Sequence, residues 1–246
     1  MNERTIAVIG AGTMGVGIAV QYALYGHKVA LYSRSEQTLE RAWKTMEKNA
    51  LFLEREMGYT PEEVSQMRAR ITCTTNLETA VVNAWYVVET IIEKAAEKQA
   101  LYEKLDPMLP EDVILSSNTS YLDIFPLLPE RRRSYAAIVH WFVPAHIMPL
   151  VEIVKGPETR SDVLEQLEGL HRQCGKTVAM LERYVPGFLI NRLQSAMTRE
   201  MLFLLDNGYC TPETLDLAVK SSIMPRGMLL GLAQRADFAG DRKSVV

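Results

Sequence analysis

The first two thirds of the chain alternate short apolar runs with longer segments in which apolar residues recur every three or four positions. The short runs are rich in β-branched residues and almost uniformly apolar, which is typical of strands buried on both faces of a sheet. Six such strands are predicted at Thr5–Ile9, Lys28–Tyr32, Ile71–Thr74, Trp85–Val88, Val113–Ser116 and Ala137–His140. Two more are predicted at Val151–Val154 and Thr177–Leu181, around a helix at Ser161–Cys174.

Helical segments separate the first of these strands. They are predicted at Met14–Tyr25, Ser35–Glu56, Pro61–Arg70 and Lys94–Leu105. An alternation of strand and helix predicts crossover connections and a parallel sheet, so the fold class is α/β. The two helices within residues 35–70 are long and charged for a simple crossover, and we expect them to form a helical arm.

The pattern changes after Pro186. Helical spacing continues at Gly187–Asn207 and Pro212–Ser221, and no strand pattern follows. We therefore expect two domains: an α/β domain over residues 1–183, and a smaller all-α domain over residues 184–246.

Composition and charge narrow the function classes. The 246 residues carry 27 Lys plus Arg against 30 Asp plus Glu, and a net charge of -3 gives no general electrostatic reason to bind nucleic acid or an anionic membrane. The apolar runs are far shorter than the roughly 20 residues that cross a bilayer, and the N-terminus has no signal-peptide pattern. The three cysteines, without any Cys-x-x-Cys pattern, predict neither a disulfide framework nor a metal site. We expect a cytoplasmic protein with no nucleic-acid or membrane partner.

A glycine-rich motif follows the first predicted strand and opens the first predicted helix. It reads Gly10-Ala11-Gly12-Thr13-Met14-Gly15. Glycines permit a tight turn and a close approach of the backbone to a pyrophosphate, whose charge is stabilised at the helix N-terminus. The motif alone also matches ordinary glycine turns, but its place between strand and helix favours a dinucleotide site. Gly10, Gly12, Thr13, Met14 and Gly15 are therefore predicted to bind the cofactor.

The end of the second predicted strand bears on the choice of cofactor. NAD-binding proteins usually carry an acid here for the ribose 2′-hydroxyl, whereas this chain has Ser33 and Arg34. A guanidinium can hydrogen-bond a 2′-phosphate, so we assign both residues to the cofactor and favour NADP over NAD. The alternative is that Arg34 is solvated and that Ser33 or Ser35 caps the next helix.

Further motifs follow in order along the chain. They are Val87-Val88-Glu89-Thr90-Ile91-Ile92-Glu93 followed by Lys98, Ser117-Asn118-Thr119-Ser120, His140-Trp141-Phe142, Pro149-Leu150-Val151-Glu152 and Pro186-Gly187-Phe188-Leu189-Ile190-Asn191-Arg192. With the glycine motif, their order and approximate spacing resemble the L-3-hydroxyacyl-CoA dehydrogenases over essentially the whole chain. This resemblance implies a Rossmann-type dinucleotide-binding domain followed by an α-helical domain that also forms dimers. It also implies oxidation of a 3-hydroxyacyl-CoA at C3, or reduction of the ketone.

His140 and Glu152 match the catalytic pair of that family. Imidazole is a suitable base near neutral pH for the hydroxyl proton, and a carboxylate on its other nitrogen fixes the tautomer. On sequence alone, a histidine at a strand end is more often a packed core residue, and Glu152 could simply be a charge at the sheet edge.

Four more polar residues match the site of the family. Ser120 and Asn191 match residues near the substrate oxygen, although a serine that ends a strand and an asparagine on a helix also have ordinary structural roles. Glu93 and Lys98 match residues that contact the cofactor, although an exposed helical face would look the same.

The chain departs from the family pattern at two places. The family usually has Asn-Pro after the aromatic pair, where this chain has Val143-Pro144 and so lacks an amide. The ending, residues 236–246, also differs, and we expect a truncated or divergent helical domain there.

His146 matches no family position, and His171 is expected at the surface. Arg131-Arg132-Arg133 is expected to form a solvated turn, with a CoA phosphate site as the alternative.

The resemblance leads to an oxidoreductase of fatty acid metabolism. We expect a homodimer that transfers a hydride between NAD or NADP and C3 of a short 3-hydroxyacyl-CoA or 3-oxoacyl-CoA. The first alternative is a dehydrogenase of free small 3-hydroxy acids, which could tolerate Val143. The second is a non-catalytic dinucleotide-binding relative.

Overall fold

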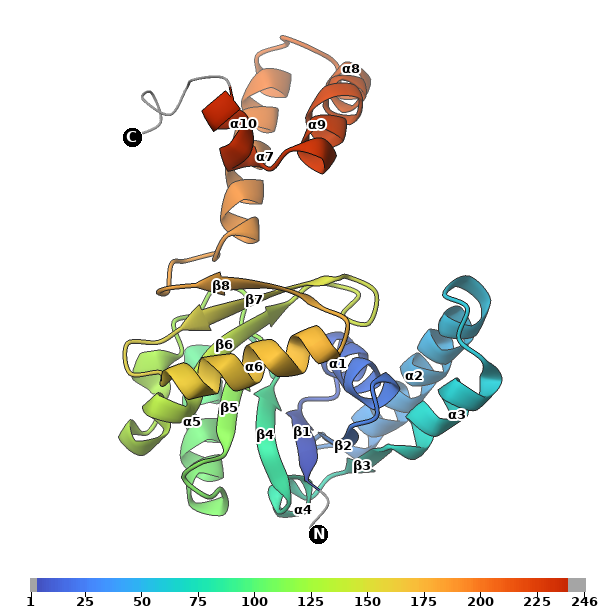
Figure 1. The fold of residues 1–246 in the computed structure, drawn as a ribbon, viewed down its shortest axis with the longest axis vertical. Helices are drawn as coiled ribbons and strands as arrows, with labels where there is room; N and C mark the ends of the chain where they lie inside the picture. The colour runs from blue at the N-terminus through green and yellow to red at the C-terminus, as the bar shows by residue number, and fades with distance from the viewer. Residues whose placement is uncertain (1–3, 239–246) are drawn as a thin grey trace. The chain divides into compact units, whose positions relative to one another are not determined.

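The structure, a computed structural model, describes residues 4–238 and divides into two units between Leu189 and Ile190 (Figure 1). The first unit is built on one eight-stranded sheet in the order β3-β2-β1-β4-β5-β6-β7-β8. The strands are β1 (Thr5–Ile9), β2 (Lys28–Tyr32), β3 (Ile71–Thr74), β4 (Ala84–Glu89), β5 (Ile114–Ser117), β6 (Ala136–Trp141), β7 (Leu150–Lys155) and β8 (Thr177–Leu181).

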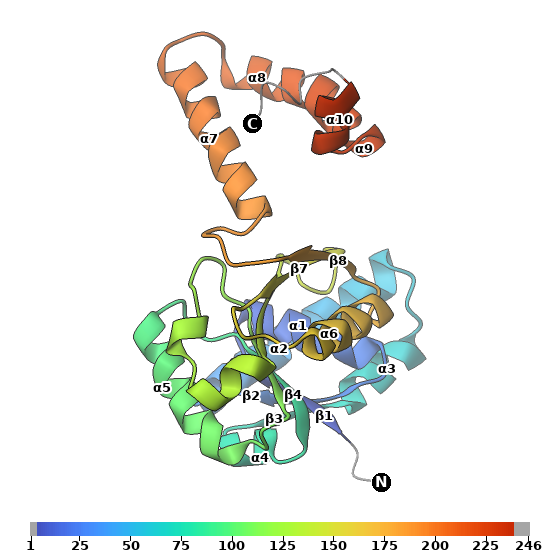
Figure 2. The ribbon, with the colours of Figure 1, turned by 60° about the vertical axis from the view of Figure 1, so that its left-hand side comes forward.

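Helices cover both faces of this sheet, as Figure 2 shows for α5 and α6 on opposite sides. One face is covered by α1 (Thr13–Leu24), α2 (Glu36–Glu56), α3 (Pro61–Ala69) and α6 (Ser161–Gln173), and the other by α4 (Leu77–Val81) and α5 (Ala95–Leu105). Burial on both faces explains why the strands are apolar throughout. The predicted α/β class is confirmed.

The sheet contains one reversal of direction that the strand pattern did not predict. All neighbouring strands pair in parallel except β6 and β7, which are antiparallel. Only residues 142–149 link these two strands, and a parallel connection needs a crossover of a dozen or more residues. The short link therefore brings the end of β6 beside the start of β7.

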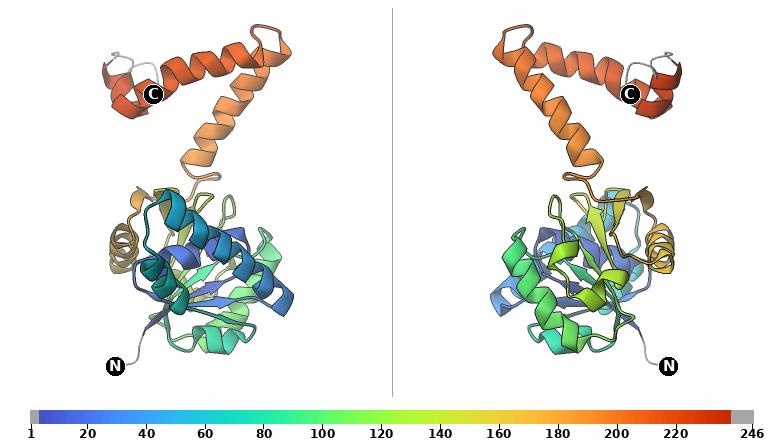
Figure 3. Two further views of the ribbon diagram at one scale, coloured as in Figure 1. Left: turned by 90° about the vertical axis from the view of Figure 1, so that its right-hand side faces the viewer. Right: turned by 90° about the vertical axis from the view of Figure 1, so that its left-hand side faces the viewer.

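The helices α2 and α3 form the predicted pair, and they lie side by side (Figure 3). Thr60 caps α3 in a reciprocal capping box with Glu63, which fixes where this helix begins. Arg68 of α3 forms an ion pair with Glu47 of α2 at 2.8 Å. The apolar positions of both helices face α1 and belong to the same core, so the pair is packed against the sheet layer.

The second unit begins with a long amphipathic helix, α7 (Ile190–Asp206). It continues with α8 (Pro212–Ala218), a π-helical turn at Val219–Ile223, α9 (Met224–Leu229) and α10 (Leu232–Phe238). Residues 239–246, which hold most of the divergent ending, lie outside the described residues. None of the helices within residues 4–238 is both long enough and apolar enough to cross a membrane.

Two polar residues are buried where the sequence predicted exposure. Arg132 is 1% exposed, and its guanidinium binds the carboxylate of Asp106 at 2.7 Å and four backbone carbonyls. The expected solvated turn is therefore wrong for this residue. His171 is fully buried, and both ring nitrogens have partners there. One lies 2.8 Å from the hydroxyl of Tyr22 and the other 2.6 Å from the carbonyl of Leu167.

Candidate active site

The glycine motif forms the turn from β1 into α1, at the carboxyl end of the sheet. Strand order reverses between β1 and β4, and ligands of open α/β sheets bind at such a switch point. Gly10 has φ 120°, and a Cβ on Gly15 would lie 1.8 Å from the carbonyl oxygen of Gly10. The turn itself therefore requires these two glycines.

Gly12 is different, because the protein itself does not require a glycine there. Its φ is -78°, and a Cβ would meet nothing within 4 Å. Among the described residues, no side chain caps α1, so its first N–H groups are available to an anion. A ligand that comes close to the backbone explains the glycine, so the loop fits a dinucleotide pyrophosphate.

A pocket of about 600 Å³ extends from this loop to the end of β2. Gly10 and Gly12 line one part of it, and Ser33 and Arg34 line another. The Arg34 side chain is 82% exposed, and its guanidinium lies 3.9 Å from the carboxylate of Glu97, a long ion pair. Arg34 is thus placed at the pocket with its guanidinium open to a ligand. The hydroxyl of Ser35 accepts from the backbone N–H of Thr38 and caps α2.

His140 and Glu152 are directly opposite each other in the β6–β7 pair. Opposite residues of antiparallel strands point to the same face, so the 12-residue separation becomes a side-chain contact. Nδ1 of His140 lies 2.8 Å from Oε2 of Glu152, and both side chains are buried. The structure therefore brings the two predicted residues together, and Nε2 of His140 remains for a reacting group.

A backbone hydrogen bond and two aromatic rings, which the sequence did not predict, hold this pair. The second oxygen of Glu152 accepts a hydrogen bond of 2.9 Å from the backbone N–H of Leu189. Phe188, which precedes it, has φ 49°, a left-handed conformation that is rare for a bulky residue. The rings of Phe142 and Phe188 lie 4.6 and 5.2 Å from the His140 ring. This aromatic enclosure restricts the orientation of the imidazole.

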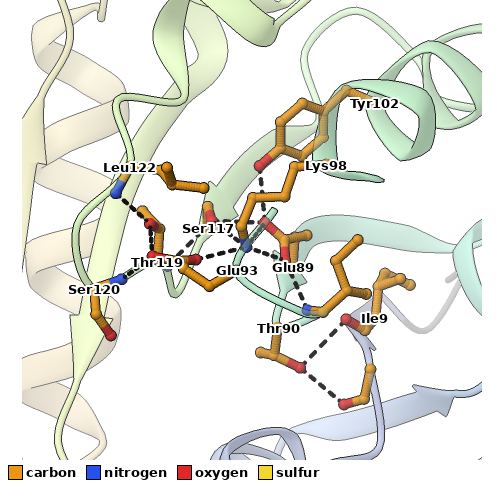
Figure 4. A network of polar contacts seen from close by, with 12 residues as sticks. Ile9, Glu89, Thr90, Glu93, Lys98, Tyr102, Ser117, Thr119, Ser120 and Leu122 are labelled. Atoms are coloured by element: carbon orange, nitrogen blue, oxygen red, sulfur yellow. Dashed lines mark hydrogen bonds and ion pairs between the residues drawn. The ribbon is translucent and has the colours of Figure 1, made fainter. Parts of the chain in front are cut away.

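A buried ionic network lies behind the loop after β5 (Figure 4). The ammonium of Lys98 lies 2.7 and 2.9 Å from the two carboxylate oxygens of Glu89. Ser117 and Tyr102 also donate to Glu89, at 2.6 and 2.8 Å. Lys98 is 1% exposed, so the exposed-face alternative is wrong for this residue. Its contact with a cofactor stays a prediction.

Glu93 connects this network to the loop that carries Ser120 (Figure 4). One oxygen accepts from the Thr119 hydroxyl at 2.5 Å and from the Ser120 N–H at 2.8 Å. The other oxygen lies 3.4 Å from Lys98. Partial burial acts to raise the pKa of Glu93, but these hydrogen bonds and the ammonium lower it below its ordinary value. An ionised Glu93 thereby fixes the position of Ser120.

The remaining predicted residues are in other places. Thr13 and Met14 line a second pocket, between α1, α2 and the β6–β7 loop. Asn191 is in the first turn of α7, within the second unit, and its part in the site stays a prediction. Within residues 4–238, no group of three or more His, Cys, Asp or Glu side chains is placed to hold a metal ion.

Comparison with protein families matches both units. Residues 5–184 match the family described as "3-hydroxyacyl-CoA dehydrogenase, NAD binding domain". Residues 187–242 match "3-hydroxyacyl-CoA dehydrogenase, C-terminal domain". The first match gives this chain a nicotinamide cofactor, NAD at least.

Individual relatives agree with this match. The chain is 32% identical to 3-hydroxyadipyl-CoA dehydrogenase of Escherichia coli over 98% of its own length, and it spans 50% of that protein. It is 33% identical to a probable 3-hydroxybutyryl-CoA dehydrogenase of Bacillus subtilis, covering 98% of this chain and 82% of the relative.

A solved structure shows the same architecture. It is that of 5-formyl-3-hydroxy-2-methylpyridine 4-carboxylic acid 5-dehydrogenase, described as an NAD⁺-dependent dismutase. It superposes with a TM-score of 0.85 at 29% identity, covering 96% of this chain and 76% of the other. On the family match over both units and these relatives, the chain belongs to the 3-hydroxyacyl-CoA dehydrogenase family.

Proposed function

We propose that this chain transfers a hydride between a nicotinamide cofactor and C3 of a 3-hydroxyacyl-CoA or 3-oxoacyl-CoA. The observation that carries the proposal is the buried contact of 2.8 Å between His140 Nδ1 and Glu152 Oε2. Oxidation of a secondary alcohol releases a proton as well as a hydride, so the protein must supply a base. The bound nicotinamide supplies the hydride acceptor.

His140 is the proposed base. Because Nδ1 donates to Glu152, the neutral imidazole presents its lone pair at Nε2, which accepts the hydroxyl proton. The carboxylate then stabilises the imidazolium that forms. In the reduction of a ketone, Nε2 returns this proton to the substrate oxygen.

Ser120 and Asn191 are proposed to hold the substrate oxygen. A hydroxyl and an amide can both donate to an oxygen on which charge grows as the hydride moves. The backbone of Ser120 is held by Glu93 at 2.8 Å, which supports a fixed position for its hydroxyl. Glu93 and Lys98 thus support the site from behind this loop.

For the cofactor, we propose use of NADP in addition to NAD, with a preference for NADP. The end of β2 carries Ser33 and an exposed Arg34 in place of the acid that is usual in NAD-binding proteins, and Glu97 of α5, which also lines the pocket, lies 3.9 Å from Arg34. Arg34→Ala should weaken NADP(H) more than NAD(H), and Ser33→Asp should shift preference toward NAD(H). Ratios of kcat/KM for the two cofactors measure both effects. A wild type selective for NAD(H), with a ratio that Arg34→Ala leaves unchanged, would contradict the assignment.

We further propose a cytoplasmic homodimer that serves fatty acid metabolism, with the second unit as the dimer contact. Leu193, Met197 and Met201 form an exposed apolar stripe along α7. Sedimentation should show a dimer in the wild type and a monomer for Met197→Glu. Arg199→Glu, on the opposite side of the same helix, is the matched control and should stay dimeric.

A second candidate function is oxidation of a free small hydroxy acid. Val143 favours it, because the usual amide is missing, and so does the similarity to a dehydrogenase of a pyridine carboxylic acid. A third candidate, a non-catalytic dinucleotide-binding relative, would leave the His140–Glu152 pair unused.

One assay separates the three candidate functions. Loss of reduced cofactor absorbance is followed with acetoacetyl-CoA and with free acetoacetate, each with NADH and with NADPH. His140→Ala and Glu152→Gln should lower turnover by at least roughly 100-fold while cofactor affinity is nearly unchanged. His27→Ala, which changes a histidine outside the pair, is the control. Near wild-type turnover in a folded His140→Ala protein would remove this residue as the base.

A further inference from the structure

The second pocket of the first unit has no part in the reaction described so far. It measures about 370 Å³ and lies between the start of α1, the helix α2 and the β6–β7 loop. Met14 lines it from the glycine motif, and Lys48 and Asn49 line it from α2. The loop contributes Val143 and His146, so the pocket adjoins the strand that carries His140.

His146 is a buried polar residue without a partner. It is 8% exposed, and its Nδ1 has no hydrogen-bond partner among the described residues. A Cβ on Gly17 would lie 3.5 Å from this nitrogen, so Nδ1 faces α1. Nε2 is therefore the nitrogen that a ligand in the pocket can reach. Buried polar groups are normally paired, and an unpaired one calls for a functional explanation.

Lys176 holds this part of the loop in place. It is buried, and its ammonium donates to the carbonyls of Ala145 at 2.7 Å and Met148 at 2.8 Å, on either side of His146. Burial, and then the charge of Lys176, lower the pKa of His146 below its ordinary value. The imidazole is therefore neutral near pH 7. Because a buried N–H without an acceptor is rarer than a buried acceptor without a donor, the lone pair is favoured at the unpaired Nδ1 and the proton at Nε2.

The same pocket wall lacks the donor that the family usually has. Val143 is 63% exposed and can neither donate nor accept a hydrogen bond. His146 is three residues further along the same wall and lines the same cavity. In this chain, the polar side chain of this wall is therefore at position 146 and not at position 143.

We propose that His146 is a substrate-binding residue that donates from Nε2 to a carbonyl oxygen of the acyl-CoA chain, and that it sets specificity for substrates carrying such an acceptor. This proposal rests on the proposed function. A carbonyl-bearing chain fits the pocket because Lys48 and Asn49 also offer donors from the facing wall. Thr13 and Met14 of the glycine motif also line this pocket, so it adjoins the cofactor loop, and the other residues of the dinucleotide pocket are a separate set. A substrate that meets the nicotinamide therefore has to lie beside this loop.

The test compares His146→Leu with wild type in stability and in binding. Leucine fills similar space without a polar atom, and no side-chain hydrogen bond of His146 within residues 4–238 is lost. The free energy of unfolding should therefore be unchanged or higher, whereas a structural role would lower it. KM and the calorimetric Kd for acetoacetyl-CoA should both rise, by roughly 3- to 10-fold for one neutral hydrogen bond. The Kd for NADH should stay the same.

Two further variants sharpen the test. His146→Leu combined with Val143→Asn returns a donor to the same wall and should restore much of the affinity for acetoacetyl-CoA. His27→Leu changes a partly buried histidine outside the pocket and should leave KM and both Kd values unchanged.

The outcomes separate this proposal from the proposed function. If wild type turns over acetoacetyl-CoA and His146→Leu binds it equally well, His146 does not bind substrate, and the proposed function stands. If wild type shows no turnover, the proposed function fails, and calorimetry alone decides: weaker binding by His146→Leu supports the contact, and equal or absent binding overturns it. A variant that loses stability and NADH affinity together also overturns the proposal.

Discussion

Replacement of Lys98 by methionine tests the buried network behind the Ser120 loop. Lys98 and Glu89 are 1% and 0% exposed, and the ammonium contacts both carboxylate oxygens. Methionine keeps most of the side-chain volume but leaves the Glu89 charge without a cation. Removal of one partner from a buried pair typically costs about 3 to 5 kcal/mol. Ser117, Tyr102 and the N–H of Ile91 still donate to this carboxylate, so we expect about 3 kcal/mol.

Urea unfolding followed by tryptophan fluorescence measures this loss. Trp43, Trp85 and Trp141 are the three tryptophans of the chain, and all are in the first unit, so the signal reports the unit that contains the network. Exposed Lys94, four residues earlier, provides the matched control, because Lys94→Met should change the free energy of unfolding by less than about 0.5 kcal/mol.

A double variant separates charge from shape. Adding Glu89→Gln to Lys98→Met removes the unpaired charge and keeps one acceptor oxygen for the remaining donors. It should recover roughly half of the loss, since a neutral hydrogen bond contributes about 1 kcal/mol. A loss below about 1 kcal/mol in Lys98→Met, or an equal loss in the double variant, would refute the idea that an uncompensated charge causes the instability.

Two other predictions follow from buried polar residues. Arg132→Leu should destabilise the first unit by about 3 kcal/mol, because it leaves the carbonyls of Leu109, Pro110 and Glu111 without this donor and leaves Asp106 with Arg131 alone. Replacing the partly buried neighbour in Arg133→Leu should cost less than about 1 kcal/mol. Urea midpoints check both, and equal losses would contradict the assignment. Burial lowers the pKa of His171 from 6.5 to about 4, so between these values the unfolded chain binds a proton that the folded chain does not, and stability falls as the pH falls through this window. At ~1.4 kcal/mol per pH unit, the free energy of unfolding falls by about 3 kcal/mol between pH 6.5 and 4 because of this group. His171→Phe should lose about 3 kcal/mol less than wild type over this range. Parallel profiles of unfolding free energy against pH for the two proteins would contradict the reasoning.

Much of the fold could be predicted from local patterns. Continuous apolar runs mark the buried strands, and the glycine motif between β1 and α1 marks the carboxyl end of the sheet. The direction of β7 was not predicted, although the signal was present: the link over residues 142–149 is too short for a parallel crossover. The five-residue helix α4 is too short to show helical periodicity, so it was missed as well.

The burial of single polar residues could not be predicted, because their partners are distant in the sequence. Arg132 binds Asp106, 26 residues away, and His171 pairs with Tyr22, 149 residues away. A histidine or arginine without a visible partner is reasonably expected at the surface. By contrast, His140 and Glu152 are joined by one strand pair, and family motifs mark both positions, so their proximity could be anticipated.

The glycine loop contains glycines that folding requires and one glycine that only ligand binding explains. Gly10 and Gly15 are required by the turn itself, so a library of variants selected only for folding should retain both. Gly12 occupies the N-cap of α1 with an ordinary φ of -78° and open space around its missing Cβ. Serine or aspartate caps a helix better than glycine, so the same library should replace Gly12. Only selection for growth on dinucleotide-dependent activity should keep it, which makes this position a record of the ligand in the sequence.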